Sequence, residues 1–190
     1  IKIISPRYSG TFLDCTFGQG GYSEKILENK KNNIIAFDRD FDAIKLSKKF
    51  KSRFKNRFEF HHKKFSEIND INSKNIKAII FDLGYSTDQL FDERKGLSFK
   101  SKGKLNMRLG LNSFSADDAI NKLDQQDLTK IFKFFGDEKD GKIIAKKIVY
   151  ERKNKELNTY DLLKIIDSVK RKKFNKTHNA TKIFQAIRIF

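Results

Sequence analysis

Apolar residues in the first hundred positions fall into short runs that alternate with amphipathic stretches. Strands are predicted where the apolar runs are continuous or alternate with polar residues, at residues 10–14, 33–37, 57–60 and 77–81. Helices are predicted where apolar residues recur at helical spacing, at residues 22–29 and 41–50. Strands that alternate with helices in this order are typical of a parallel α/β sheet.

The pattern changes after residue 84. Residues 84–112 contain four glycines and scattered polar residues, which predicts a long loop region of the kind that is usually functional or mobile. Helical spacing then returns, with Ser115 and Thr159 as candidate caps, at residues 115–123, 127–135, 139–152, 160–172 and 179–190. We expect an α/β domain over residues 1–110, with a sheet incomplete at its C-terminus, and a helical, basic domain over residues 111–190.

Composition narrows the class of protein. Of the 190 residues, 38% are hydrophobic and 34% are charged, as in a soluble globular protein with a modest core. No apolar run reaches the length of a membrane span, and no signal peptide is visible. Cys15 is the single cysteine, and the histidines at 61, 62 and 178 lack the spacing of metal ligands. We expect a cytoplasmic protein with no membrane partner and no metal.

Net charge points to a polyanionic partner, most simply a nucleic acid. The formal net charge is +17, and residues 142–182 alone hold 13 Lys/Arg against 4 Asp/Glu. The densest cluster in that segment is predicted to contact phosphates, and it consists of Arg171, Lys172, Lys173 and Lys176. The alternative is that these residues form an ordinary solvated surface. The whole chain is rich in Lys, Asn, Ile and Phe, so part of the excess of lysines is explained by a general bias of composition.

Three aspartates, Asp14, Asp38 and Asp82, fall at the carboxyl ends of predicted strands. Ligands of parallel α/β sheets bind at the carboxyl ends of the strands, so this edge is the candidate site. A glycine turn (Gly18, Gly20 and Gly21) follows Asp14 and permits a tight bend close to a ligand. Asp38 is placed to accept both hydroxyls of an adenosine ribose.

The spacing of the glycines distinguishes two cofactors. A dinucleotide fingerprint is G-x-G-x-x-G, whereas this turn reads Gly18-x-Gly20-Gly21 and follows an acidic residue. An acidic residue disfavours a pyrophosphate and suits a ligand with an ammonium group, so the turn favours S-adenosylmethionine over NAD. The alternative for Asp14 is that it only caps the following helix.

Asp82 opens the stretch DLGYS. In methyl transfer to an exocyclic amine, the site must accept an N–H hydrogen bond and align the nitrogen with the methyl group. A carboxylate at a strand end supplies the acceptor, which makes Asp82 a candidate catalytic residue. It is equally a candidate for a cofactor contact, and the sequence does not separate the two roles.

Several motifs occur in an order that resembles a known family. They are DCTFGQGGYS (14–23), AFDRD (36–40), FDLGYSTDQL (81–90), KGLSF (95–99), GKLNMRL (103–109), FGDEKDGKIIAKKI (135–148) and ATKIFQAIRIF (180–190). Together they resemble the bacterial small-subunit (16S) ribosomal RNA cytosine-N4 methyltransferases, the methyltransferase H family. The resemblance implies a class I, Rossmann-like S-adenosylmethionine-dependent methyltransferase sheet with an inserted helical subdomain. It also implies methylation of N4 of a cytidine in the decoding region of the small ribosomal subunit.

The resemblance also assigns cofactor contacts, which fall on Gly20, Gly21, Tyr22, Asp38, Phe65, Asp82 and Gln89. Phe65 would lie against adenine, although the residue pattern alone is equally compatible with a core position. The family usually has His where Tyr22 stands, so this contact is expected through the side chain or only through the backbone.

Tyr85 is a second candidate catalytic residue. The family usually has a small aliphatic residue there, whereas Asp82-x-x-Tyr85 has the acid-to-aromatic spacing of amino-methyltransferase motifs. The ring is therefore a candidate for stacking on a flipped cytosine. The alternative is a half-buried tyrosine that packs the loop.

Other functions remain open on the sequence. One is a methyltransferase that acts on another nucleic acid, and a second is a non-catalytic RNA-binding protein that retains the fold. A third, an NAD-dependent oxidoreductase, is disfavoured by the glycine spacing and by Asp14.

Overall fold

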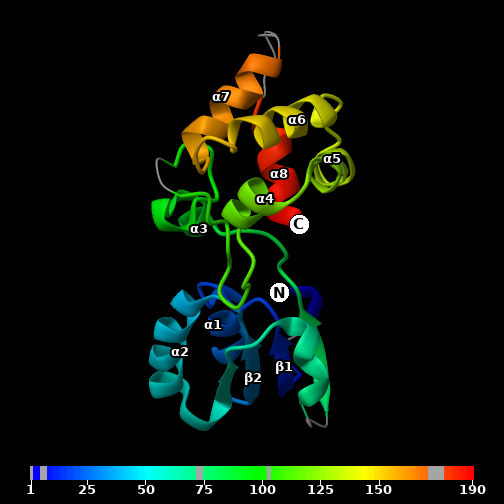
Figure 1. Cartoon of the computed structure of the whole chain (residues 1–190). Coiled ribbons are helices and arrows are strands. Elements are labelled where there is room, and N and C mark those ends of the chain that lie inside the picture. Colours follow the sequence, from blue (N-terminus) through cyan, green and yellow to red (C-terminus); the bar gives the residue numbers. More distant parts are fainter. Residues whose placement is uncertain (1, 5–7, 72–74, 102–103, 171–177) are drawn as a thin grey trace. The chain divides into compact units, whose positions relative to one another are not determined.

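The computed structural model describes residues 2–4, 8–71, 75–101, 104–170 and 178–190. The chain divides into two compact units (Figure 1). The α/β unit comprises residues 1–84 and 109–111, and the helical unit comprises residues 85–108 and 112–190. The long glycine-containing segment, which we placed with the sheet, therefore falls largely in the helical unit.

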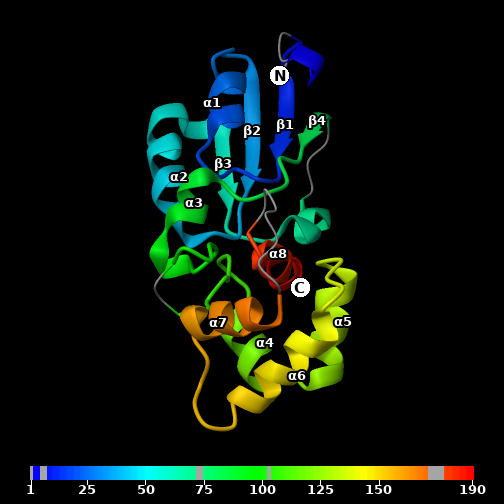
Figure 2. The ribbon, with the colours of Figure 1, turned by 90° about the horizontal axis from the view of Figure 1, so that it is seen from above.

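Four parallel strands form the sheet in the described part of the α/β unit, in the order β3-β2-β1-β4 (Figure 2). Their bounds are β1 (Gly10–Asp14), β2 (Asn32–Phe37), β3 (Phe58–His61) and β4 (Ile76–Ile80). The predicted parallel α/β sheet is confirmed, and each strand begins within one residue of its predicted start. Runs of apolar residues predicted the inner strands correctly, because β1 and β2 lie inside the sheet and are covered on both faces.

Successive side chains of the inner strands enter two different cores. Phe12 and Ile34 face the helices α1 (Gly21–Leu27) and α2 (Phe41–Phe54), where the aromatic rings of Phe17 and Phe50 complete the larger core. Leu13, Ile35 and Phe37 face the opposite side, which the short 3-10 helix η3 (Phe65–Asp70) covers (Figure 1). The sheet thus forms the middle of three layers, because alternate residues of a strand point to opposite faces.

The helical unit contains α3 (Thr87–Phe91), η4 (Glu93–Lys95), α4 (Ala116–Lys122), α5 (Gln125–Phe134), α6 (Gly141–Glu151), α7 (Thr159–Val169) and α8 (Thr181–Ile189). Helix α8 lies against α4 and α5 and buries Ile183, Phe184 and Ile187 (Figure 1). Helix α3 and η4 form inside the segment predicted as loop, because Ser86 and Gln89 close a capping box that the pattern of apolar residues does not reveal.

Capping side chains set the starts of the later helices. Ser115 accepts a hydrogen bond from the backbone N–H of Asp118 (3.0 Å), as predicted for α4. Helix α7 is different, because Asn158 rather than Thr159 is its capping residue. The Asn158 side chain accepts a hydrogen bond from the N–H of Asp161 (3.0 Å), and Thr159 is the buried first residue of the helix. An Asn side chain caps as well as a Thr hydroxyl, so adjacent candidates are not separable by residue type.

Among the described residues, no helix combines the length and the apolar character that a membrane crossing requires.

Candidate functional site at the carboxyl edge of the sheet

The structure brings Asp14, Asp38 and Asp82 together at the carboxyl ends of β1, β2 and β4. Their proximity has an electrostatic consequence, because the charges of Asp38 and Asp82 both contribute to raising the pKa of Asp14. The main cause of the raised pKa of Asp14 is burial, and the hydrogen bond from Ser23 acts in the opposite direction. This edge of the α/β unit is therefore an acidic site in a strongly basic protein.

Asp38 holds the glycine turn against the end of β2. One carboxylate oxygen, Oδ2, accepts a hydrogen bond from the backbone N–H of Gly18 (2.7 Å), and Oδ1 accepts one from the N–H of Asp40 (2.8 Å). Asp38 is half-buried, and each carboxylate oxygen has a further lone pair. The side chain is thus fixed in orientation and still able to accept hydroxyl donors from a ligand.

The glycine turn is closely packed at one glycine and open at the next. Gly20 has φ of +75°, and a Cβ atom placed there would lie 2.6 Å from the ring of Phe50 and 3.1 Å from that of Phe17. Gly21 is different, because a Cβ atom there would have nothing within 4 Å. A ligand can therefore approach the backbone at Gly21, whereas Gly20 is required by the fold itself. Tyr22, the next residue, is 39% exposed.

Asp14 has a structural role in the turn. It is fully buried, and its carboxylate accepts hydrogen bonds from the Ser23 hydroxyl (2.7 Å) and from the N–H of Thr16 (3.3 Å). Ser23 lies in the first turn of α1, so Asp14 ties the end of β1 to the start of this helix. The N-terminal capping residue of α1 is Gly20, not Asp14. The structure thus favours the structural interpretation of Asp14 over direct contact with an ammonium group.

Asp82 is exposed and lies just beyond β4. Its backbone N–H donates to the hydroxyl of Thr16 (2.7 Å), which fixes the chain at this point. The carboxylate itself has no hydrogen-bond partner among the described residues. The Asp82 side chain is therefore available to a ligand.

Phe65 and Phe81 form an exposed aromatic pair in the same unit. Their ring centroids are 5.5 Å apart with an interplanar angle of 85°, and the two residues are 44% and 49% exposed. Phe65 is thus not a core residue, which was one of its two possible interpretations. The sequence did not indicate that Phe81 is exposed, because the last residue of an apolar run is interpreted as part of a buried strand.

Tyr85 and Gln89 belong to the helical unit. The Tyr85 hydroxyl donates to the backbone carbonyl of Arg188 (2.8 Å), and Arg188 donates through Nη1 to the carbonyl of Leu97 (2.7 Å). The Gln89 side chain accepts the N–H of Ser86 (3.0 Å) in the capping box of α3. Both residues therefore have partners within the helical unit that the sequence did not indicate.

The basic cluster of Arg171, Lys172, Lys173 and Lys176 lies outside the described residues. In the described ranges, no group of three or more His, Cys, Asp or Glu side chains is placed to hold a metal ion.

The fold and the acidic, glycine-lined edge are those of a class I, Rossmann-like methyltransferase. Comparison with known proteins gives the family. The model of the MraW methylase family matches residues 1–190, so the chain belongs to the MraW methylase family.

The chain is similar to curated proteins named ribosomal RNA small subunit methyltransferase H. It is 38% identical over 199 residues to the one from Orientia tsutsugamushi (strain Ikeda), with 100% of this chain and 63% of that protein covered. The protein from Rickettsia bellii (strain OSU 85-389) is 38% identical over 192 residues, with the same coverage. The protein from Anaplasma phagocytophilum (strain HZ) is 36% identical over 200 residues and 68% covered. The chain thus spans about two thirds of the length of these relatives.

Proposed function

We propose that this protein transfers a methyl group from S-adenosylmethionine to N4 of a cytidine in the decoding region of small-subunit (16S) ribosomal RNA. The observation that carries the proposal is the edge of the sheet where Asp38 holds the glycine turn at Gly18 and where the backbone of the same turn is open at Gly21. The names of the relatives support ribosomal RNA of the small subunit as the substrate. The partner is then the small ribosomal subunit or its RNA, in the cytoplasm.

The residues at this edge fit S-adenosylmethionine. Asp38 has free acceptor capacity for the ribose hydroxyls, and Gly21 leaves space beside the backbone. Phe65 presents an exposed ring of the size that packs on adenine. A pyrophosphate would be repelled by the three carboxylates, so the site favours a nucleoside cofactor without phosphate. When bound, this cofactor supplies the electrophilic methyl group.

Asp82 then acts on the substrate side. Its unpartnered carboxylate accepts an N–H of the cytosine amine and orients the nitrogen for attack. Asp82→Asn keeps the size of the side chain and removes the charge. If Asp82 acts on the amine, the variant loses methyl transfer and retains cofactor affinity. If it contacts the cofactor instead, the affinity for S-adenosylmethionine falls as well.

The role of Tyr85 is tested by two variants. Tyr85→Phe removes the hydroxyl bond to Arg188 and keeps the ring, whereas Tyr85→Leu removes both. If Tyr85 stacks on the target cytosine, the Tyr85→Phe variant retains methyl transfer and the Tyr85→Leu variant loses it. Equal loss in both variants assigns Tyr85 instead to the hydroxyl bond that holds α8 at Arg188. Gln89 and Tyr22 remain proposed cofactor contacts, because the resemblance to the methyltransferase H family implies them.

The decisive experiment measures cofactor binding and methyl transfer separately. S-adenosylmethionine and NAD are titrated calorimetrically into the protein, with Asp38→Ala as the variant expected to lose binding. Tritiated methyl incorporation is then measured on small ribosomal subunits that lack the modification. Binding of NAD in preference to S-adenosylmethionine contradicts the proposal, and so does the absence of incorporated label. Reversing the charge of Arg171, Lys172 and Lys173 is expected to weaken RNA binding and to flatten its salt dependence.

A further inference from the structure

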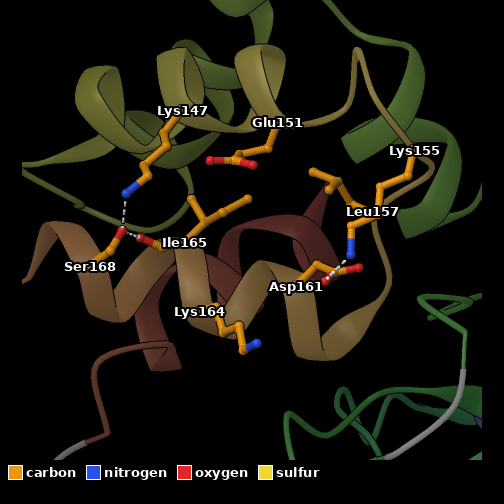
Figure 3. A pocket seen from close by; sticks show the side chains of 8 residues that line it. All are labelled: Lys147, Glu151, Lys155, Leu157, Asp161, Lys164, Ile165 and Ser168. Atoms are coloured by element: carbon orange, nitrogen blue, oxygen red, sulfur yellow. Dashed lines mark hydrogen bonds and ion pairs between the residues drawn. The ribbon is translucent and has the colours of Figure 1, made fainter.

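A pocket lies between α6 and α7 in the helical unit (Figure 3). Its volume is about 330 Å³, which is at the lower end of the usual size of small-molecule sites, roughly 300–1,000 Å³. Lys147 and Glu151 enter it from α6, and Ile165 and Ser168 enter it from α7 (Figure 3). The pocket is made entirely within one unit and shares no residue with the acidic edge of the sheet.

One lysine contact lies at each end of the pocket (Figure 3). At one end, Nζ of Lys147 donates to the hydroxyl of Ser168 (2.6 Å). At the other end, Nζ of Lys155 lies 2.6 Å from Oδ1 of Asp161, and its side chain is largely exposed. The contact of Lys147 is exposed and contributes little stability, so its ammonium group can turn to a phosphate at small cost. Asp161 is buried, so Lys155 stays paired with its carboxylate.

Glu151 lies between these two ends and is the unusual group in the pocket (Figure 3). It is partly buried, and its carboxylate has no side-chain partner among the described residues. Buried apolar side chains, Leu157 and Ile165, lie beside it. The pocket therefore offers cations near its ends and one group that only accepts hydrogen bonds in its middle.

We propose that this pocket binds an unpaired guanosine of an RNA strand, with the base edge on Glu151 and a flanking phosphate on Lys147. Guanine is the one RNA base that presents two adjacent N–H donors on its pairing edge, and a carboxylate accepts both. Adenine and cytosine place an acceptor nitrogen beside their amino group, and uracil places its N–H between two carbonyls. RNA as the source of the guanosine rests on the proposed function.

The test compares two pentanucleotides, UUGUU and UUAUU, by fluorescence anisotropy without any cofactor. Wild-type protein is expected to bind UUGUU roughly tenfold more tightly, which is the lower range for a good bidentate contact to a base. Glu151→Gln is expected to remove this preference, because an amide has one acceptor oxygen. Lys147→Met is expected to weaken both oligonucleotides alike and to lower the slope of log affinity against log salt by about 1.

Matched controls come from neighbouring residues that do not line the pocket. Glu156→Gln and Lys146→Met change an exposed carboxylate and an exposed lysine, and both are expected to retain the preference for guanosine. Equal binding of the two pentanucleotides by wild-type protein overturns the proposal, as does a preference that survives Glu151→Gln. GMP binding as tightly as UUGUU would assign the pocket to a free nucleotide and would also overturn it.

The outcome is independent of the methyl-transfer experiment. A guanosine preference that depends on Glu151 in a protein without methyl transfer contradicts only the proposed function. Normal methyl transfer by a protein that binds both pentanucleotides equally contradicts only the pocket.

Discussion

The aspartates at the strand ends of the α/β unit and those in the first turns of α4 and α7 have opposite electrostatic surroundings. In the α/β unit, Asp14, Asp38 and Asp82 lie together without a cationic partner among the described residues. In the helical unit, two aspartates in the first turns of helices are paired with lysines, Asp118 with Lys122 and Asp161 with Lys155. Burial raises the pKa of Asp14, whereas the hydrogen bond from Lys122 lowers the pKa of Asp118 and that from Lys155 lowers the pKa of Asp161.

The difference in pairing distinguishes aspartates of a candidate binding site from aspartates that stabilise helices. Like charges held together at a strand end oppose folding, and they persist where the surrounding hydrogen bonds fix them. Paired acids at helix starts satisfy backbone N–H groups and neutralise a nearby lysine, which favours folding. We therefore expect substitution of Asp14 and substitution of Asp118 to change stability in opposite directions as the pH rises.

The largest effect is expected at Glu138 in the helical unit. Its buried carboxylate forms an ion pair with Lys170, whose side chain is also mostly buried. Glu138→Ala leaves the Lys170 charge without its partner and is expected to lower the free energy of unfolding by about 3 kcal/mol. Asp137→Asn is the matched control, because the Asp137 pair with Lys182 is solvent-exposed and should cost less than about 1 kcal/mol. Urea unfolding followed by circular dichroism measures both, and equal losses would contradict the assignment.

A smaller effect is expected at the glycine turn, and it distinguishes fold from binding within the α/β unit. Gly20→Ala forces a Cβ against the rings of Phe50 and Phe17 at positive φ, and is expected to cost about 2 kcal/mol of stability. Gly21→Ala has free space and should leave stability within about 0.5 kcal/mol of wild type. It is expected instead to weaken S-adenosylmethionine binding. Urea midpoints and calorimetric titration of both variants check this, and a stable Gly20→Ala protein would refute it.

The smallest effect is a difference in pH dependence between Asp14 and Asp118. The pKa of Asp14 is raised on folding, so its contribution to stability is greatest below the ordinary value of 3.8 and is lost as the pH rises through the folded value. Asp14→Asn is thus expected to gain stability relative to wild type as the pH rises. The pKa of Asp118 is lowered, so its contribution is present above 3.8 and is lost as the pH falls through the folded value.

Unfolding free energies of Asp14→Asn and Asp118→Asn, measured against wild type from about pH 3 to pH 7, should therefore have slopes of opposite sign. The same sign in both variants would remove the distinction between the two units.

The sequence predicted elements best where burial is complete. The inner strands β1 and β2 and helices such as α5 follow from runs and spacings of apolar residues, because a buried face leaves little choice of residue type. Short elements held by polar bonds were missed, as at α3, where Ser86 and Gln89 exchange hydrogen bonds. The capping position of α7 was wrong by one residue for the same reason, since Asn158 and Thr159 are both good caps.

By itself, the sequence determined the parallel sheet, the helical second half and the strand ends at which Asp14, Asp38 and Asp82 lie. Periodicity of apolar residues and the order of the motifs carry that information. The tertiary structure alone decided that Asp14 is buried on Ser23, that Gly20 is packed and Gly21 is open, and that Tyr85 bonds the carbonyl of Arg188. Those facts depend on contacts between residues distant in the chain, and no local pattern of side chains records which neighbours a folded chain will bring together.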